Sequence, residues 1–173
     1  LGVEYVSSFA LLGIDKEGLL STDEKLEVLI ARNAWQKELI WNRFSMDQLG
    51  MSISQPDKVR RSSQTISVGN TGNWSTKNYL PMGCLKNKET DSILFWQIEQ
   101  NGSWYWEISD QDGHMYLQLS GPTEHQSHWW KNLKPGDTFA SVPVSVGSAC
   151  GDVEEAAGEL TKYRRAIRRK NED

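Results

Sequence analysis

Glu99 and Glu107 are the two acids of this sequence best placed to work as a pair. They lie in neighbouring aromatic-rich segments, and cleavage of a glycosidic bond, for example, needs two carboxylic acids that flank one cleft. The strand register predicted below puts the two side chains on opposite faces of a sheet. The other acids fall in predicted turns or on a predicted helix. We therefore expect no catalytic residue and no enzymatic activity from residues 1–173 alone.

Histidine and cysteine residues form no pattern typical of a metal site. His125 and His128 are three residues apart, with His114 and a glutamate nearby, in a segment without predicted regular structure. A zinc site needs three or four converging ligands, so we expect loop side chains, no metal and no other cofactor. Cys84 and Cys150 form no CxxC motif. Buried free thiols are the favoured interpretation, with a disulfide as the alternative.

Tryptophan is unusually frequent, with eight residues in the chain, six of them between Trp74 and Trp130. Tryptophan suits either a sandwich core or a surface that stacks on sugar rings, because it combines a large apolar face with one N–H donor. Trp129 and Trp130 lie in the least regular segment. The default interpretation is that one closes an end of the sandwich while the other covers a neighbouring domain. The alternative is contact with a sugar, for which Trp129, Trp130 and Trp35 are the candidate residues.

Strands must position most of these residues. β-branched, aromatic or alternating residues predict strands over 3–14, 25–33 and 138–146, the last two with one apolar face each. Residues 35–50 fit either a helix or a strand, and a strand is favoured. Pro135-Gly136 fits the centre of a type II turn.

A three-stranded meander is predicted between Ile93 and Ser120. Asn101-Gly102 and Asp112-Gly113 are strong signals for two-residue hairpin turns, because a type I′ turn needs positive φ at both positions. The first turn pairs Glu99 with Trp104, Ile98 with Tyr105, Gln97 with Trp106 and Phe95 with Ile108. The second pairs Ile108 with Leu117 and Trp106 with Leu119.

This register sorts the side chains of the meander onto two faces. The core face holds Phe95, Trp104, Trp106, Ile108, Met115, Leu117 and Leu119, and the other holds Trp96, Ile98, Tyr105, Glu107, Tyr116 and Gln118. We therefore expect Trp104 and Trp106 to be core residues and not ligand platforms.

A single long helix is predicted over residues 152–169. Asp152 and Glu155 form a capping box, and an apolar stripe follows with helical spacing. The stripe consists of Val153, Ala156, Ala157, Leu160, Tyr163 and Ile167. Arginines crowd its end, and they are interpreted as a solvated face or as partners for acids of a neighbouring domain.

The composition of the chain limits the classes of function that it can have. The chain has 173 residues and a formal net charge of −4. This charge argues against a nucleic-acid partner, because binding to the phosphates of a nucleic acid needs a basic face. No apolar stretch approaches the roughly 20 residues that a membrane helix needs. A run of strands followed by one helix predicts a mainly β fold, an antiparallel β-sandwich with one C-terminal helix.

Five segments of the chain resemble glycoside hydrolase family 36 α-galactosidases. They are NWSTKNYLPMG (residues 73–83), FWQIEQNGSWYWEI (95–108), LSGPTE (119–124), HWWKNLKPGDTF (128–139) and LTKYRRAIRR (160–169). The resemblance covers most of the chain and is strongest from about residue 64 onward.

The resemblance implies an N-terminal β-supersandwich, of the galactose-mutarotase type, ahead of a (β/α)₈ barrel that carries the two catalytic aspartates of a retaining mechanism. On this basis residues 1–150 would be part of that sandwich and residues 151–173 a helix leading into the barrel. The chain would begin after the first strands of the sandwich and stop near the start of the barrel. No catalytic residue of the family falls on this sequence.

The partners implied by the resemblance are the chain's own barrel and other copies in a homo-oligomer, with an α-galactoside as substrate of the parent enzyme and a cytoplasmic location favoured. Two other hypotheses stay open. One is a stand-alone carbohydrate-binding module, and the other is an unrelated structural sandwich.

Overall fold

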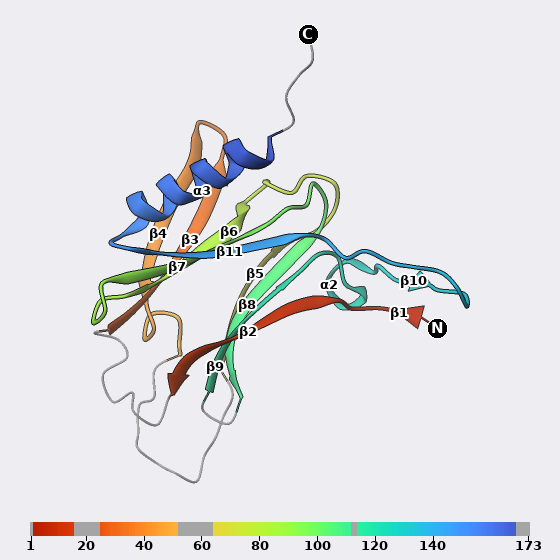
Figure 1. The fold of residues 1–173 in the computed structure, drawn as a ribbon, viewed down its shortest axis with the longest axis horizontal. Helices are drawn as coiled ribbons and strands as arrows, with labels where there is room; N and C mark the ends of the chain where they lie inside the picture. Colours follow the sequence, from red (N-terminus) through yellow and green to blue (C-terminus); the bar gives the residue numbers. More distant parts are fainter. Residues whose placement is uncertain (1, 16–24, 52–63, 112–113, 169–173) are drawn as a thin grey trace.

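The computed structural model describes residues 2–15, 25–51, 64–111 and 114–168, which form an antiparallel β-sandwich with one long helix (Figure 1). The strands are β1 (Gly2–Val3), β2 (Ser7–Asp15), β3 (Leu26–Ala34), β4 (Lys37–Ser45), β5 (Thr65–Asn70), β6 (Tyr79–Asn87), β7 (Ser92–Ile98), β8 (Trp104–Gln111), β9 (His114–Ser120), β10 (Lys131–Asn132) and β11 (Val144–Cys150). The helices are α2 (Glu124–Ser127) and α3 (Val153–Ile167).

Two antiparallel sheets make the sandwich, and this confirms the predicted fold class. One sheet has five strands in the order β11-β7-β6-β3-β4, and the other has four in the order β2-β9-β8-β5. β1 and β10 form a separate two-stranded ribbon. Figure 1 shows α3 lying across the five-stranded sheet, so the molecule has a helix layer and two sheet layers.

The core between the two sheets is built mainly from alternate residues of their strands, together with Met46 and Met51 from the segment after β4. Its buried members are Leu26, Val28, Ile30, Met46, Met51, Val68, Leu85, Trp96, Ile98, Trp104, Trp106, Ile108, Met115, Leu117 and Leu119. Trp96 and Trp106 meet edge to face across it, with ring centroids 5.1 Å apart. The prediction that Trp104 and Trp106 are core residues is confirmed. Gly83 permits this packing, because a Cβ there would lie 2.5 Å from the Trp96 ring.

The predicted hairpin at Asn101-Gly102 is wrong. β7 pairs with β6 and β11, and β8 pairs with β5 and β9, so the chain crosses from one sheet to the other at this point. Neither Asn101 nor Gly102 has the positive φ that a type I′ turn needs. Instead, Gly72 N–H donates to Ser103 Oγ at 2.9 Å. That bond holds the connection against the loop before β6.

The second half of the predicted meander is confirmed. β8 and β9 pair with Ile108 opposite Leu117 and Trp106 opposite Leu119, as predicted. The turn residues Asp112 and Gly113 themselves lie outside the described residues.

The predicted faces of β7 are reversed. Trp96 and Ile98 lie in the core between the sheets, whereas Phe95 lies in a second cluster on the opposite side of the five-stranded sheet. The reversal follows from the missing hairpin, because β7 belongs to the opposite sheet from β8. Both faces of β7 are buried, so its apolar residues do not alternate with polar ones.

Helix α3 covers the outer face of the five-stranded sheet. The buried residues of this second cluster are Leu29, Ala31, Met82, Cys84, Ile93, Phe95, Ala156 and Leu160. Strand β3 is thus buried on both faces, not on one as predicted. Asp152 caps α3 with the predicted capping box. The predicted stripe is only partly buried, since the side chain of Ile167 is 50% exposed.

Strand boundaries differ from the prediction in three places. The segment 3–14 divides into β1 and β2, and the strand expected over 138–146 begins only at Val144. In the ambiguous segment 35–50, the strand interpretation is confirmed over β4, while Trp35 lies in the turn before it. The turn at Pro135-Gly136 is confirmed, because Gly136 has φ +90 and Asp137 N–H donates to the carbonyl of Lys134 at 3.0 Å.

Candidate functional site

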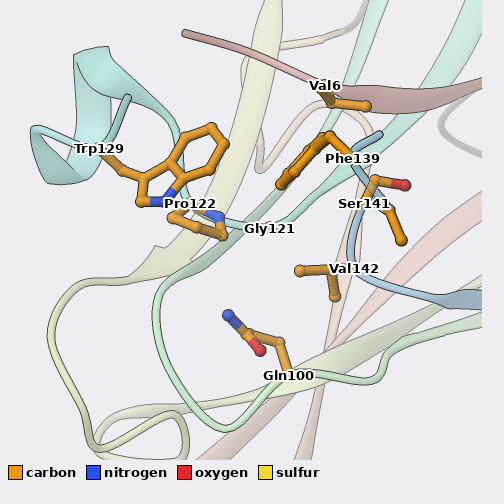
Figure 2. Close-up of a pocket in the computed structure, with 9 residues that line it drawn as sticks. Val6, Gln100, Gly121, Pro122, Trp129, Phe139, Ser141 and Val142 are labelled. Atoms are coloured by element: carbon orange, nitrogen blue, oxygen red, sulfur yellow. The ribbon is translucent and has the colours of Figure 1, made fainter. Parts of the chain in front are cut away.

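A small pocket lies at one end of the sandwich, where five separate parts of the chain meet (Figure 2). Its lining comes from the residues just before β2, just after β7 and β9, just after α2, and just before β11. The lining residues are Val6, Gln100, Gly121, Pro122, Trp129, Phe139, Ala140, Ser141 and Val142. The pocket has a volume of about 180 Å³. Pockets for drug-sized ligands are roughly 300–1,000 Å³, so this one has room for a single small ring.

The floor of the pocket depends on a glycine. A Cβ at Gly121 would lie 2.4 Å from Cγ2 of Val142, so only glycine lets the end of β9 approach the segment before β11 this closely. Glu99 N–H donates to the carbonyl of Pro143 at 2.9 Å, which extends the pairing of β7 with β11 to the pocket edge. The approach of Gly121 to Val142 and the hydrogen bond from Glu99 to Pro143 therefore hold the backbone at the floor of the pocket against the two sheets.

Helix α2 sets the direction of Trp129. Thr123 caps the helix by accepting from Gln126 N–H at 3.1 Å, and His128 ends it in the left-handed conformation with φ 53. This αL residue reverses the chain, and Trp129 N–H returns to the carbonyl of Thr123 at 3.2 Å. The indole is thereby directed over the end of the sandwich.

Trp129 and Phe139 form the aromatic wall of the pocket. Their ring centroids are 5.5 Å apart with 37° between the planes, and Lys131 Nζ lies 5.5 Å from the centroid of Phe139. The wall is suited to an apolar or partly apolar ring.

Polar groups are few among the lining residues. Figure 2 shows the side-chain amide of Gln100 directed into the space between Trp129 and Val142. An amide offers two donors and an acceptor, which suits a hydroxyl-bearing ligand. An aromatic wall with one or two placed polar groups is typical of a small-ligand site.

The structure separates the three candidate residues predicted from the sequence. Trp129 lines the pocket, whereas Trp130 does not and is 60% exposed. Trp35 is 89% exposed in the turn between β3 and β4, at the far edge of the five-stranded sheet from β11. The three side chains therefore do not form one site.

Sequence reasoning missed Phe139, Gln100 and Val142 as pocket residues. The sequence predicts a strand over 138–146 with one apolar face, and the alternation of residues puts Val142 on that face and Phe139 on the other. The alternation correctly predicts packing for Val142, which lies against the core, but not for Val146 on the same face, which is 50% exposed. It does not indicate that Phe139 meets Trp129. Trp74, which is 63% exposed in the loop before β6, was also not singled out.

Of the two glutamates considered as an acid pair, Glu99 directly follows β7 and Glu107 lies in β8 of the other sheet. Different partners hold them. Glu99 accepts hydrogen bonds from Ser145 Oγ at 2.5 Å and from the hydroxyl of Tyr163 on α3. Glu107 accepts from the hydroxyls of Tyr105 and Tyr116. They share no hydrogen-bond partner and do not flank the pocket.

Within the described ranges, no group of three or more His, Cys, Asp or Glu side chains could hold a metal ion. The expectation of two loop histidines is wrong for His125, which lies in the short helix α2. Nδ1 of His128, the residue after α2, lies 3.9 Å from Oε1 of Glu124. Cys84 is a buried free thiol, as expected, and burial raises its pKa to about 12, so it stays protonated and unreactive. The expectation that Cys150 is buried is wrong, because β11 is an edge strand and turns this side chain to solvent.

The arginines at the end of α3 do not act as one group. Arg164 donates from Nε to Oε1 of Gln97 at 2.8 Å and is thus tied back to β7. Arg165 and Arg168 are exposed and form no ion pair within the part of the chain that the structure describes. Arg169 lies outside the described residues.

Comparison with family models gave no match to this chain, and comparison with curated proteins also gave none. No helix among the described residues is long and apolar enough to cross a membrane.

Proposed function

We propose that this chain is a non-catalytic part of the N-terminal domain of an α-galactosidase-like glycoside hydrolase. Residues 1–150 would form the sandwich, and residues 151–173 would lead into a catalytic (β/α)₈ barrel. The domain would pack on that barrel and on other subunits of a homo-oligomer. The enzyme as a whole would hydrolyse terminal α-galactosides. The sequence resemblance in five ordered segments supports the family, and the antiparallel sandwich is compatible with it.

The observation that carries the packing role is the exposure of large apolar side chains in turns and at the end of α3. Trp35 is 89% exposed, and Trp74 is 63% exposed. Ile167 is exposed in the last turn of α3, between Arg165 and Arg168. Tryptophan and arginine are enriched among the residues that dominate protein interfaces. These surfaces are suited to contact with a neighbouring domain or subunit.

The arrangement of the acids supports a non-catalytic role. The carboxyl groups of a retaining glycosidase stand about 5–5.5 Å apart on either side of the scissile bond. Glu99 directly follows β7, Glu107 lies in β8 of the other sheet, and each is bound to its own hydroxyl partners.

Hydrolysis of an aryl α-galactoside tests this proposal. The full-length protein that contains this chain should release the aryl group, and purified residues 1–173 should not. Turnover by residues 1–173 that survives repurification and follows the protein peak would contradict the non-catalytic role. Absence of turnover by the full-length protein would contradict the family.

A stand-alone carbohydrate-binding module is the second candidate function. The pocket beside Trp129 favours it, since its size, its aromatic wall and the amide of Gln100 suit one pyranose ring.

A titration of ¹⁵N-labelled residues 1–173 with methyl α-galactoside, followed by NMR, tests the second candidate. Binding should shift the indole N–H signal of Trp129, and Trp129→Ala should weaken the affinity by about tenfold or more, equivalent to about 1.4 kcal/mol. Trp35→Ala is the matched control, because that tryptophan lies outside the pocket and should leave the affinity unchanged. Shifts that persist at full size in Trp129→Ala would exclude the pocket.

A further inference from the structure

The link between β7 and β8 contains the one Asn-Gly dipeptide of the chain, Asn101-Gly102. The pair lies where the chain crosses from one sheet to the other, outside both strands. Asn101 is exposed and Gly102 is partly exposed. Solvent water therefore reaches the side-chain amide of Asn101.

The reactive groups of this pair are not held by hydrogen bonds. Within the part of the chain that the structure describes, neither the side-chain amide of Asn101 nor the backbone N–H of Gly102 has a hydrogen-bond partner. The link is anchored on both sides of the pair, by the bond from Glu99 N–H to the sheet and by the bond from a backbone N–H to Ser103 Oγ at 2.9 Å. Between these anchors, the amide carbon of Asn101 and the nitrogen of Gly102 are free to approach each other.

Asn33 and Asn70 show the opposite arrangement. Asn33 Nδ2 donates to the carbonyl of Thr76 at 2.6 Å, and Asn70 Nδ2 donates to the carbonyl of Trp74 at 2.6 Å. The residue after each of them carries a Cβ, which hinders attack by its backbone nitrogen. Gly102 has no Cβ, so its nitrogen can come closer to a neighbouring group.

We infer that Asn101 is a site of spontaneous deamidation, in which the backbone nitrogen of Gly102 attacks the side-chain amide carbon of Asn101. Asparagine is one of the thermolabile residues of proteins. The attacking N–H gives its proton to water or hydroxide, the new C–N bond closes a five-membered succinimide, and the side-chain nitrogen leaves as ammonia. Water then opens the ring at either carbonyl. The product is aspartate or isoaspartate, and in both a carboxylate replaces the neutral amide.

The new carboxylate would lie beside the pocket. Gln100 directly precedes Asn101, and its amide is directed into the pocket (Figure 2). Nε2 of Gln100 is also 3.5 Å from the place that a Cβ of Gly102 would occupy. Deamidation therefore changes the charge at the edge of the pocket without an enzyme or a cofactor. A chain converted at this site carries one more negative charge than the formal −4 of the sequence.

This inference does not rest on the proposed α-galactosidase function, and its test needs no ligand. Residues 1–173 are kept at mildly alkaline pH, folded in buffer or unfolded in guanidinium chloride, and are sampled over several weeks by peptide mass spectrometry. In the folded chain, the peptide with Asn101 should gain one dalton at a rate within several-fold of the rate in the unfolded chain. The rate should rise with pH, because hydroxide removes the N–H proton. The peptides with Asn33 and Asn70 should keep their mass in the folded chain.

Gly102→Ala is the matched variant for this test. Gly102 does not have a positive φ, and an added Cβ would meet only ordinary contacts, the nearest at 3.5 Å. The variant should therefore fold normally, which circular dichroism checks. Its methyl group should slow the deamidation of Asn101 several-fold.

Three results would overturn the inference. One is an unchanged rate in folded Gly102→Ala. Another is conversion of Asn101 in guanidinium chloride with none in the folded chain, because the link would then hold the two groups apart. The third is equally fast conversion of Asn33 in the folded chain. If Gly102→Ala does not fold, the comparison of folded and unfolded chains still decides. A failure here would leave the hydrolysis assay of the full-length protein unaffected, so the two proposals fail separately.

Discussion

The tryptophans between the sheets and the tryptophans in the turns have opposite environments. Trp96, Trp104 and Trp106 are at most 1% exposed, whereas Trp35 is 89% exposed. The first group occupies inward positions of strands, and Trp35 lies in a turn whose backbone has left the sheet. Position within an element, and not residue type, therefore decides whether a tryptophan stabilises the fold or is available to a partner.

The largest expected effect is the loss of a core tryptophan. Trp106→Ala should lower the free energy of unfolding by about 3–5 kcal/mol, because it removes a fully buried indole and leaves a cavity. Trp35→Ala should change it by less than about 0.5 kcal/mol, as for an ordinary surface position. Denaturant titration of the two variants measures both values. Similar losses for the two would contradict the division into core and turn tryptophans.

The helix offers the same comparison with aliphatic residues. Leu160→Ala should cost about 2–5 kcal/mol, because Leu160 is buried between α3 and the five-stranded sheet. Ile167→Ala, on the half-exposed end of the predicted stripe, should cost clearly less. Thermal unfolding of the pair measures the difference. Equal costs would mean that the last turn of α3 is docked as firmly as its middle.

A finer comparison separates two buried tryptophans by their N–H groups. Trp104 Nε1 donates to the carbonyl of Ser75 at 2.6 Å, whereas Trp106 Nε1 has no hydrogen-bond partner within the described structure. Replacement by phenylalanine should therefore cost about 1 kcal/mol more at Trp104 than at Trp106, the typical net value of one hydrogen bond. The free energies of unfolding of Trp104→Phe and Trp106→Phe measure this. A larger loss at Trp106 would indicate that its N–H has a partner in solution.

The smallest effect concerns the surface pair at the start of α3. Arg43 Nη2 donates to Asp152 at 2.7 Å, and this bond lowers the pKa of Asp152. A lowered folded pKa stabilises the protein above the ordinary aspartate pKa of about 4, and this stability is lost as the pH falls through the folded value. Asp152→Asn, which can still cap the helix, should cost about 0.2–1 kcal/mol at pH 7. The difference from the unsubstituted chain should shrink below pH about 4, and a constant difference would contradict the ion pair.

Local sequence signals predicted the elements that depend on local contacts. The capping box of α3 and the pairing of β8 with β9 involve residues close in the sequence, and both are confirmed. The prediction of a hairpin at Asn101-Gly102 is wrong because contacts with residues more distant in the sequence determine the partners of β8. Trp104 bonds to Ser75 and Ser103 to Gly72, so the chain after β7 continues in the other sheet.

The pocket could be predicted only in part for a similar reason. Trp129 was singled out by its residue type and its irregular surroundings. Its neighbours come from four other places in the chain, and no periodicity relates Val6, Gln100 and Phe139. The two tyrosines that bond to Glu107 were placed on the correct face by strand alternation, but their convergence on it depends on side-chain directions that a pattern does not contain.

The interleaving of the two sheets also constrains how the chain is made. Strand β2 pairs with β9, and Ser7 faces Ser120, so β2 finds its hydrogen-bond partner only after more than a hundred further residues have been synthesised. Contacts so distant in sequence slow folding, and an unpaired strand edge is prone to aggregation meanwhile. A ribosome that adds about 5–20 residues per second would leave β2 without that partner for several seconds. Residues 7–15 are therefore the segment of this sandwich that we expect to depend most on protection during translation.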